Sequence, residues 1–283
     1  MGSSPAQTSP FQPQTIGGLV EGGFRVMGRC YWKLLPLAAV TSGVTYLLTW
    51  GIARSALADG SFVEEKIVKA PSGSGVWPEY GAGVTTVVVL IVMYLVSTAV
   101  LLPATVPAAA GYRITRIPWS SAARVVGPAL VVGILTIAIG AVGLLLLVLP
   151  GIWLLVSYSV AQAALVAEGH HGYAALRRSK SLVSGRWWPT LGLLVVVSIL
   201  TGLVSLIPLR IAEARTESAE TIVQLDNLVG FLTATITTPY VAAVTAVLYI
   251  DLRARTEPID ADSFAQMVVM SEPGAGPTAV TPG

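Results

Sequence analysis

The stretch that decides the fold is GYAALRRSKSLVSGRWWPTLGLLVVVSILTGLVSLIPL, residues 172–209. Its first half carries Arg177, Arg178, Lys180 and Arg186 and ends in the pair Trp187-Trp188. The run 190–209 contains no charged residue and has about the ~20 residues that a helix needs to cross a bilayer core. Basic residues mark the cytoplasmic end of such a helix, and tryptophan prefers the depth of the headgroups. The stretch therefore predicts a membrane-spanning helix that starts at the cytoplasmic face.

The composition of the whole chain excludes an ordinary soluble domain. Of 283 residues, 54% are hydrophobic and 11% are charged, whereas soluble domains carry roughly 25% charged residues. A net charge of +2 is too small to indicate a nucleic-acid partner. Cys30 is the single cysteine, which excludes an intrachain disulfide and a cysteine-based metal site.

Six apolar runs predict an all-α integral membrane protein with six transmembrane helices. The predicted spans cover about 34–56, 84–110, 128–149, 152–168, 190–209 and 228–250. The third and fourth runs form one apolar block about twice as long as a single span needs. Pro150 and Gly151 interrupt this block, and we predict a tight hairpin at 149–151. The membrane domain then covers 15–256, between tails 1–14 and 257–283 that we expect to be disordered.

The distribution of basic residues predicts the orientation. With the N-terminus inside, twelve of the 17 Lys and Arg residues fall on the inner side, as the positive-inside rule requires. Both termini are therefore expected in the cytoplasm. Most of these cations are arginine, a preference that favours a GC-rich bacterial genome, so the expected location is a bacterial cytoplasmic membrane.

The basic and aromatic pattern occurs more than once. Residues 16–33 form a predicted amphipathic helix that ends in Arg29, Tyr31 and Trp32 before the first span, and a shorter version, 118–124, precedes the third. We predict three pseudo-repeated units, each an amphipathic helix at the inner face followed by a membrane hairpin. The alternative is that any span entering from the cytoplasm attracts Arg and Trp.

Amphipathic helices of this kind lie in the membrane interface, with their apolar face toward lipid and their arginines toward anionic headgroups. The predicted contacts with anionic lipid or with a protein partner are Arg25, Arg29, Trp32, Arg177, Arg178, Lys180, Arg186, Trp187 and Trp188.

Three segments resemble a known family. They are LPGIW at 149–153 with ALVAEG at 164–169, ALRRS at 175–179 with GRWW at 185–188, and LYIDLRAR at 248–255 with Glu257. In these segments the chain resembles the membrane domain associated with bacterial glycerophosphoryl diester phosphodiesterases, in its stand-alone six-span form. The resemblance implies the six-span fold and leaves the biochemical role open.

Catalytic chemistry is not expected. The phosphodiesterase domains of that family are metal-dependent barrels, which need around 250 residues, and no such stretch remains outside the spans. His170 and His171 are adjacent and read as a loop pair, because neighbouring helical residues point in different directions. Arg54 and Glu168 stand at span ends, where we expect them to reach the interface. We therefore predict no catalytic residue, no cofactor and no metal.

Polar residues within the spans leave two readings open. Gln162, Thr237, Pro239 and Tyr240 are candidates for lining a cavity, because broken or polar helices form binding sites in transporters. The alternative is that such groups bond neighbouring helices together.

The favoured function is a non-enzymatic accessory, scaffolding or regulatory module at the inner membrane face, bound to anionic lipid, a membrane protein or a second copy. The alternative is a transporter or flippase-like carrier of a lipid or small amphiphile. A membrane-embedded enzyme of glycerophospholipid metabolism comes third.

Overall fold

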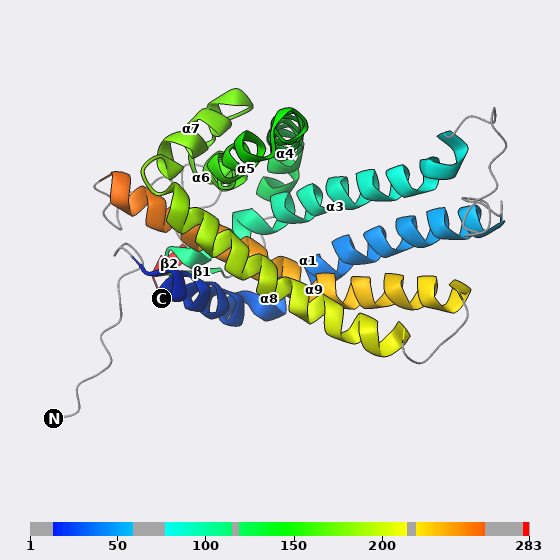
Figure 1. Ribbon diagram of the computed structural model, residues 1–283. Helices are drawn as coiled ribbons and strands as arrows, with labels where there is room; N and C mark the ends of the chain where they lie inside the picture. The colour runs from blue at the N-terminus through cyan, green and yellow to red at the C-terminus, as the bar shows by residue number, and fades with distance from the viewer. Residues whose placement is uncertain (1–13, 59–76, 115–118, 214–218, 258–279, 283) are drawn as a thin grey trace.

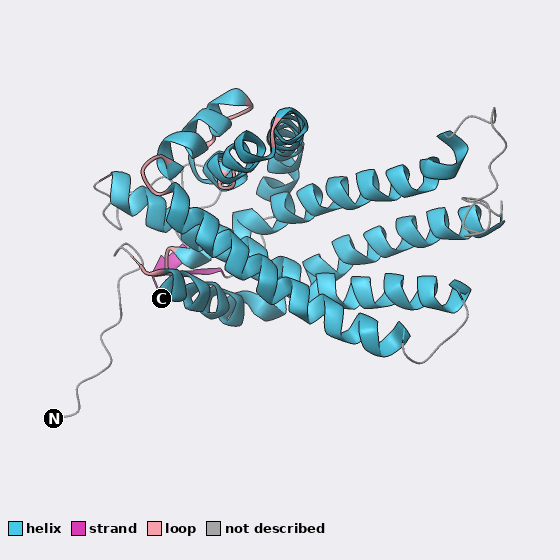
Figure 2. Cartoon of the chain, in the orientation of Figure 1, coloured by secondary structure: helices cyan, strands magenta, loops and turns pink. Residues whose placement is uncertain are grey.

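The computed structural model describes residues 14–58, 77–114, 119–213, 219–257 and 280–282. The helices are α1 Ile16–Ala58, α3 Trp77–Ala109, α4 Trp119–Leu146, α5 Val148–Ser157, α6 Ala161–Glu168, α7 Tyr173–Val183, α8 Trp187–Glu213 and α9 Ala219–Thr256. Figure 2 shows that helix accounts for nearly all of this part of the chain. The exceptions are loops and two short strands, β1 Tyr112–Ile114 and β2 Val280–Pro282.

The core lies where α1, α3 and α9 pack together. α1 contacts both α9 and α3, α3 also contacts α9 and α4, and α8 crosses over α9 (Figure 1). Leu34, Leu101, Val106 and Tyr249 are almost completely buried at this meeting of helices. In Figure 1, α4 and α5 are seen nearly along their axes, so their hairpin makes a steep angle with α3.

The prediction of six apolar helices is confirmed as far as length and composition go. Among the described residues, six segments are long and apolar enough to cross a membrane: Ile16–Ser55, Thr85–Ala109, Ala123–Leu146, Val148–Glu168, Trp187–Leu206 and Asn227–Thr256. The fifth of these starts at Trp187, where the basic and aromatic sequence ends.

The sequence predicted an amphipathic helix separate from the first span, but the structure joins the two. α1 continues without a break from Ile16 to Ala58, with Pro36 inside it. The reason is that one buried face, including Leu19, Cys30 and Leu37, runs across the expected boundary and packs on the core. A continuous partner surface removes any need for a turn there.

Only one of the three expected interfacial helices is a separate element. The short segment before the third span is part of α4, whereas α7 stands alone between α6 and α8. The apolar face of α7, with Leu176 and Leu182, is buried against the protein, so the expectation that this face lies in lipid is wrong. What α7 exposes is its polar side, with Arg177 and Lys180.

The predicted hairpin exists, but its turn comes earlier. The helix breaks at Leu147, which is extended, and Pro150 and Gly151 fall in the first turn of α5. Proline is tolerated there because the first turn needs no intrahelical N–H donor. A Cβ on Gly151 would collide with the backbone nitrogen of Leu144 and come within 2.6 Å of its Cα. Gly151 therefore permits the close approach of α4 and α5.

The fourth predicted span, 152–168, is two helices rather than one. α5 ends at Ser157 and α6 begins at Ala161. The break leaves the carbonyl of Ser157 without a helical partner, and the hydroxyl of Ser179 on α7 donates to it at 2.9 Å. A contact from a distant helix thus stabilises a break that no glycine or proline announces.

The last described residues of the chain pair with the segment that follows α3. β1 and β2 pair antiparallel, with Arg113 opposite Thr281, so a short part of the predicted disordered tail is a strand. Residues 1–13, 258–279 and 283, the rest of the two predicted tails, lie outside the described residues.

Candidate functional site

A buried charged cluster joins three helices at one end of the molecule. Glu168, the last residue of α6, is 9% exposed and accepts hydrogen bonds from Arg178 of α7, at 2.7 and 3.0 Å from Nε and 2.9 Å from Nη2. The hydroxyl of Tyr249 on α9 donates to Oε1 of the same carboxylate at 2.7 Å. We call Glu168, Arg178, Tyr249, Arg253 and Glu257 the Glu168 cluster.

The α9 members of the Glu168 cluster close it from the other side. Tyr249 and Arg253 share a face of α9, and Glu257, directly after the last residue of α9, continues the same four-residue spacing. Arg253 donates from Nη1 to the Tyr249 hydroxyl at 3.0 Å and from Nε to Glu257 at 3.2 Å. Glu257 also lies 2.7 Å from Nη1 of Arg178. Every charge in the cluster therefore faces an opposite charge.

The electrostatics of the cluster favour its ionised form. The hydrogen bond from Arg178, followed by other interactions with Arg178 and Arg253, outweighs burial and lowers the pKa of Glu257. For Arg178, burial alone would lower the pKa, but hydrogen bonds to Glu257 and Glu168 outweigh it and the net shift is upward. The cluster is therefore an internal ionic lock between α6, α7 and α9.

Sequence reasoning missed the centre of this lock. Glu168 was expected to reach the membrane interface, but the structure buries it among Arg178, Arg253 and Tyr249. His170 also lies beside it, with Nε2 3.1 Å from Oε2, so the histidines are not simply a loop pair. The available signal was the spacing of Tyr249, Arg253 and Glu257 along one face of α9.

A second polar contact ties the start of the described chain to α9. The backbone N–H of Gln14 donates to Asp251 at 2.7 Å, and Arg255 donates to the carbonyl of Gln14 at 2.6 Å. Arg255 and Asp251 also pair with each other at 2.7 Å. These bonds bring residues that precede α1 against the end of the last helix.

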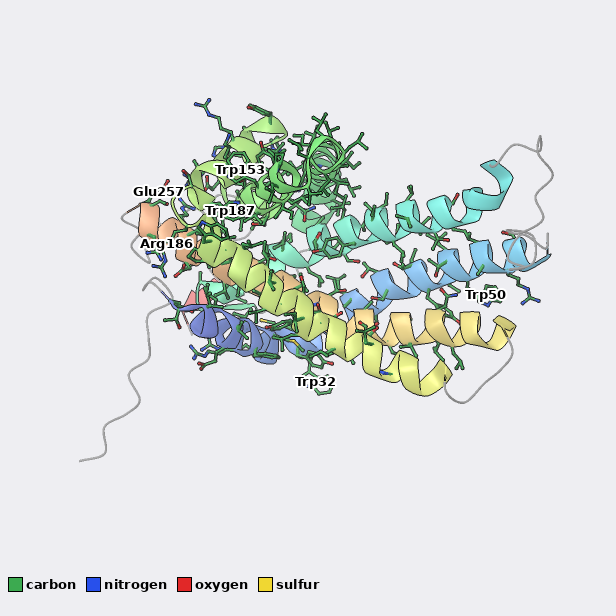
Figure 3. All side chains as sticks on the ribbon, viewed as in Figure 1. Trp32, Trp50, Trp153, Arg186, Trp187 and Glu257 are labelled. Carbon is green, nitrogen blue, oxygen red and sulfur yellow. The ribbon has the colours of Figure 1, made fainter. Side chains whose placement is uncertain are left out.

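The predicted lipid contacts of α7 and α8 form a surface that we call the basic corner: Arg177, Lys180, Arg186, Trp187 and Trp188. Arg177, Lys180, Arg186 and Trp188 are exposed. The Nζ atom of Lys180 lies 5.0 Å from the ring centre of Trp153, and the indole N–H of Trp187 donates to the Trp153 carbonyl at 3.3 Å. Figure 3 shows Trp153, Arg186 and Trp187 together at the end of the molecule that also carries Glu257.

Gly185 allows the tight turn between α7 and α8 at the basic corner. Its φ of 85° lies in the left-handed region that glycine tolerates best, and it separates α7 from α8. Arg178, the remaining predicted contact on α7, points the other way, into the Glu168 cluster. The basic corner is thus the outer side of a helix pair whose inner side is held by the ionic lock.

The other predicted contacts are not part of this corner. Trp32 is 81% exposed but lies apart from Trp153 and Trp187 in Figure 3. Arg25 and Arg29 are on the same helix, and Arg25 pairs with Glu21 at 2.7 Å in an exposed contact. Their contact with lipid stays a prediction.

Gln162 bonds helices together in the described structure. Its Oε1 lies 2.8 Å from the Thr98 hydroxyl of α3, and its Nε2 donates to the Ala129 carbonyl of α4 at 3.3 Å. The residue therefore links α6 to two neighbouring helices. This contact is the one expected if polar residues within the spans bond neighbouring helices together.

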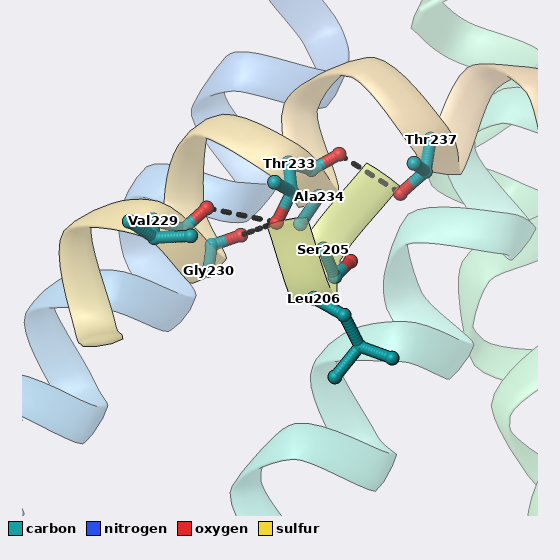
Figure 4. A pocket seen from close by; sticks show the side chains of 7 residues that line it. All are labelled: Ser205, Leu206, Val229, Gly230, Thr233, Ala234 and Thr237. Atoms are coloured by element: carbon teal, nitrogen blue, oxygen red, sulfur yellow. Dashed lines mark hydrogen bonds between the residues drawn. The ribbon is translucent and has the colours of Figure 1, made fainter. Parts of the chain in front are cut away.

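Of the other candidates for a cavity, Thr237 lines a pocket between two helices. A space of about 270 Å³ between α8 and α9 is lined by Ser205, Thr233 and Thr237 with four small or apolar neighbours (Figure 4). Each hydroxyl donates to a carbonyl of its own helix. Tyr240 is instead buried in the core against Phe24, with ring centres 4.5 Å apart, and Pro239 does not line this pocket.

Within the part of the chain that the structure describes, no group of three or more His, Cys, Asp or Glu side chains could hold a metal ion.

The comparisons with known proteins give one match. A family model described as a domain of unknown function, DUF7847, matches residues 24–252. No curated protein matches the chain, and no solved structure matches it. The matched region starts within α1, ends at Leu252, four residues before the end of α9, and contains the basic corner, Glu168, Arg178 and Tyr249.

Proposed function

Since the chain belongs to the DUF7847 family, whose function is unknown, we propose from its architecture that it is a six-span protein of a bacterial cytoplasmic membrane. The spans would be α1, α3, α4, α5 with α6, α8 and α9, with both termini in the cytoplasm. The apolar length of these segments and the distribution of basic residues support this arrangement. The tip of the α4–α5 hairpin exposes Leu145 and Leu149 at 88% and 81%, and these apolar side chains suit contact with lipid.

Within that membrane, the proposed role is a non-enzymatic accessory or scaffolding module that binds anionic lipid at the cytoplasmic face. The observation that carries the proposal is the basic corner, in which Arg177 and Lys180 are exposed on α7 and Arg186 is exposed directly before α8, whose residues 187–209 carry no charge. Cations near an anionic surface contribute about 1 kcal/mol each. Trp188, 75% exposed, is the side chain expected at headgroup depth.

The Glu168 cluster supports this role, because it holds α7 in place from behind. Arg178 bonds two carboxylates while its neighbour Arg177 stays exposed. The contacts that hold α7 lie inside the protein, so the basic corner keeps its geometry when one lipid replaces another. A stable recognition site requires such a fixed geometry.

Charge reversal tests the proposal. We expect the double variant Arg177→Glu/Arg186→Glu to retain far less anionic phospholipid than the wild type when purified in mild detergent, as counted by native mass spectrometry. Arg54→Glu is the matched control, because Arg54 is also exposed and stacks on a tryptophan, Trp50, at 5.1 Å. Equal lipid retention by the wild type, the double variant and the control would overturn the proposal.

We also propose that the family is related to the membrane domain of glycerophosphoryl diester phosphodiesterases. The three segments that carry this resemblance contribute Glu168, Arg178 and Tyr249 with Arg253, which are the residues that meet in the Glu168 cluster. The relation predicts the same three-helix lock in a structure of a phosphodiesterase-linked membrane domain, and a different contact among those segments would count against it.

A carrier of lipid or a small amphiphile is the second candidate, and the α8–α9 pocket is the observation that favours it. The pocket, about 270 Å³, is slightly below the ~300–1,000 Å³ of typical ligand sites. Lipid scrambling in proteoliposomes that is lost in Thr237→Val would favour the carrier. Hydrolysis of a glycerophosphodiester by the purified protein would instead favour the enzyme.

A further inference from the structure

An apolar groove runs along α8 beside α5. Ile152 and Leu155 line it from α5, and Leu191, Ile199, Gly202 and Leu206 are among those that line it from α8. Its volume is about 600 Å³, and Ser198 is the one polar side chain among its lining residues. This volume falls within the ~300–1,000 Å³ of sites that hold small molecules.

The groove is long enough to cover the hydrocarbon thickness of one leaflet of a bilayer. Leu191 and Leu206 are fifteen residues apart on one helix, which corresponds to roughly 22 Å at the ~1.5 Å rise of an α-helix. One leaflet contributes about half of the ~30 Å hydrocarbon core. A groove of this length can follow a chain from the headgroup region to the middle of the membrane.

The cross-section of the groove decides between occupants. Spread over that length, its volume gives a mean cross-section of about 27 Å². A helix with its side chains is about 10 Å or more across, which corresponds to roughly 80 Å². The groove therefore cannot enclose a helix, and its cross-section suits a single extended hydrocarbon chain.

Charge is found at one end of the groove. Ile152 is followed by Trp153, whose ring faces Lys180 and whose carbonyl accepts from the indole of Trp187. Arg186 precedes α8 at the same end and is exposed. No carboxylate of the described chain pairs with Arg186 or Lys180. A ligand complementary to this site has an anionic head and an apolar tail.

We propose that the α5–α8 groove binds one acyl chain of an anionic glycerophospholipid, whose phosphate lies between Lys180 and Arg186. This inference rests on the proposed function and makes it specific: the lipid is bound at a defined site rather than gathered by surface charge. Trp153 and Trp187 flank the glycerol region, and α8 carries the chain past Gly202.

Gly202 allows the site to be tested by filling it. A Cβ at Gly202 meets no atom within 4 Å, so a larger side chain enters open space in the groove rather than colliding with the protein. A Cβ at Gly127 on α4 likewise meets nothing within 4 Å, and Gly127 lies outside the groove. Gly202→Phe and Gly127→Phe are therefore a matched pair.

The experiment adds phosphatidylglycerol to delipidated full-length protein in detergent and measures bound lipid by native mass spectrometry. Phosphatidylcholine with the same chains is the comparison lipid. We expect Gly202→Phe to weaken phosphatidylglycerol binding about tenfold, while Gly127→Phe binds as the wild type does. Ser198→Leu narrows the same groove more mildly, and we expect an intermediate loss. Thermal unfolding of each variant verifies that it is folded.

The outcomes separate the groove from the proposed function. If folded Gly202→Phe and Ser198→Leu bind lipid as the wild type does, the proposal that the groove binds an acyl chain is overturned. This holds even when Arg177→Glu/Arg186→Glu loses lipid. Loss of lipid in Gly202→Phe without any preference for phosphatidylglycerol over phosphatidylcholine overturns the anionic assignment. A change in oligomeric state in Gly202→Phe, with lipid binding unchanged, would identify the groove as a protein interface and overturn the proposal.

Discussion

At the scale of single residues, Glu168 has the largest structural consequence. Its carboxylate is 9% exposed and bonds Arg178 and Tyr249, with Arg253 3.6 Å away. A buried ion pair contributes little compared with an apolar pair of the same shape, but loss of one partner strands the other charge. The cluster therefore acts mainly by favouring one arrangement of α6, α7 and α9, because other arrangements would leave a buried charge unpaired.

Replacement of Glu168 should show that removing one partner of the buried ion pairs is costly. We expect Glu168→Ala to lower the free energy of unfolding by about 3–5 kcal/mol, because it leaves Arg178 and Arg253 without their shared carboxylate. The measurement is thermal or denaturant unfolding in detergent. Glu21→Ala is the control, since its exposed pair with Arg25 should cost no more than about 0.5 kcal/mol. Similar losses in the two variants would contradict the ionic lock.

The second residue-scale prediction concerns pH and Glu257. The folded-state pKa of Glu257 is lowered from its ordinary value of about 4.5. Its contribution to stability is therefore complete above that value and is lost as the pH falls through the lower, folded-state pKa. Melting temperatures measured from pH 6 downward should fall more gently in Glu257→Gln than in the wild type below about pH 4.5. An unchanged slope would show that Glu257 does not stabilise the fold through its charge.

At the scale of elements, the α4–α5 hairpin depends on close contact between two apolar helices. The turn uses a single extended residue, Leu147, and returns the chain so that Gly151 lies against Leu144. No polar side chain stabilises this turn, because residues 144–149 are all Leu or Val. The turn is held by steric fit and by backbone hydrogen bonds from Leu147 to Gly143 and from Gly151 to Leu147.

A methyl group is enough to test that fit. Gly151→Ala should lower the melting temperature by several degrees, because its Cβ would collide with the backbone of Leu144 rather than with a flexible side chain. Gly127→Ala, which enters open space on the same hairpin, should leave the melting temperature unchanged or slightly raised. A harmless Gly151→Ala would mean that α4 and α5 lie farther apart.

At the scale of the whole molecule, orientation can be measured with two introduced cysteines. Cys30 is buried, so Cys30→Ala provides the background, and Ser181 and Ser55 are exposed near the proposed inner and outer ends. We expect an impermeant thiol reagent to label Ser55→Cys in intact cells and Ser181→Cys only after the cells are opened. The reverse pattern would invert the proposed topology.

The helical architecture was predictable because apolar runs and their flanking residues are local signals. Trp187 starts α8 three residues from the predicted start of its span, since the indoles and arginines mark a helix boundary directly. The break after Ser157 was not predictable, because it depends on Ser179 from another helix. Glu168 was misplaced for the same reason: its partners come from two distant segments, and periodicity carries no information about such contacts.

The pairing of α1 with α9 has a consequence for how the protein is made. The first helix packs its buried face against the last, and Gln14 is bonded to Asp251 and Arg255. At the usual ~5–20 residues per second, the ribosome finishes α9 roughly 10–40 s after α1 has been completed. Until then α1 lacks its main partner, so the domain reaches its native packing only once synthesis is nearly complete. A chain that stops before α9 is therefore expected to be a substrate for quality-control proteolysis.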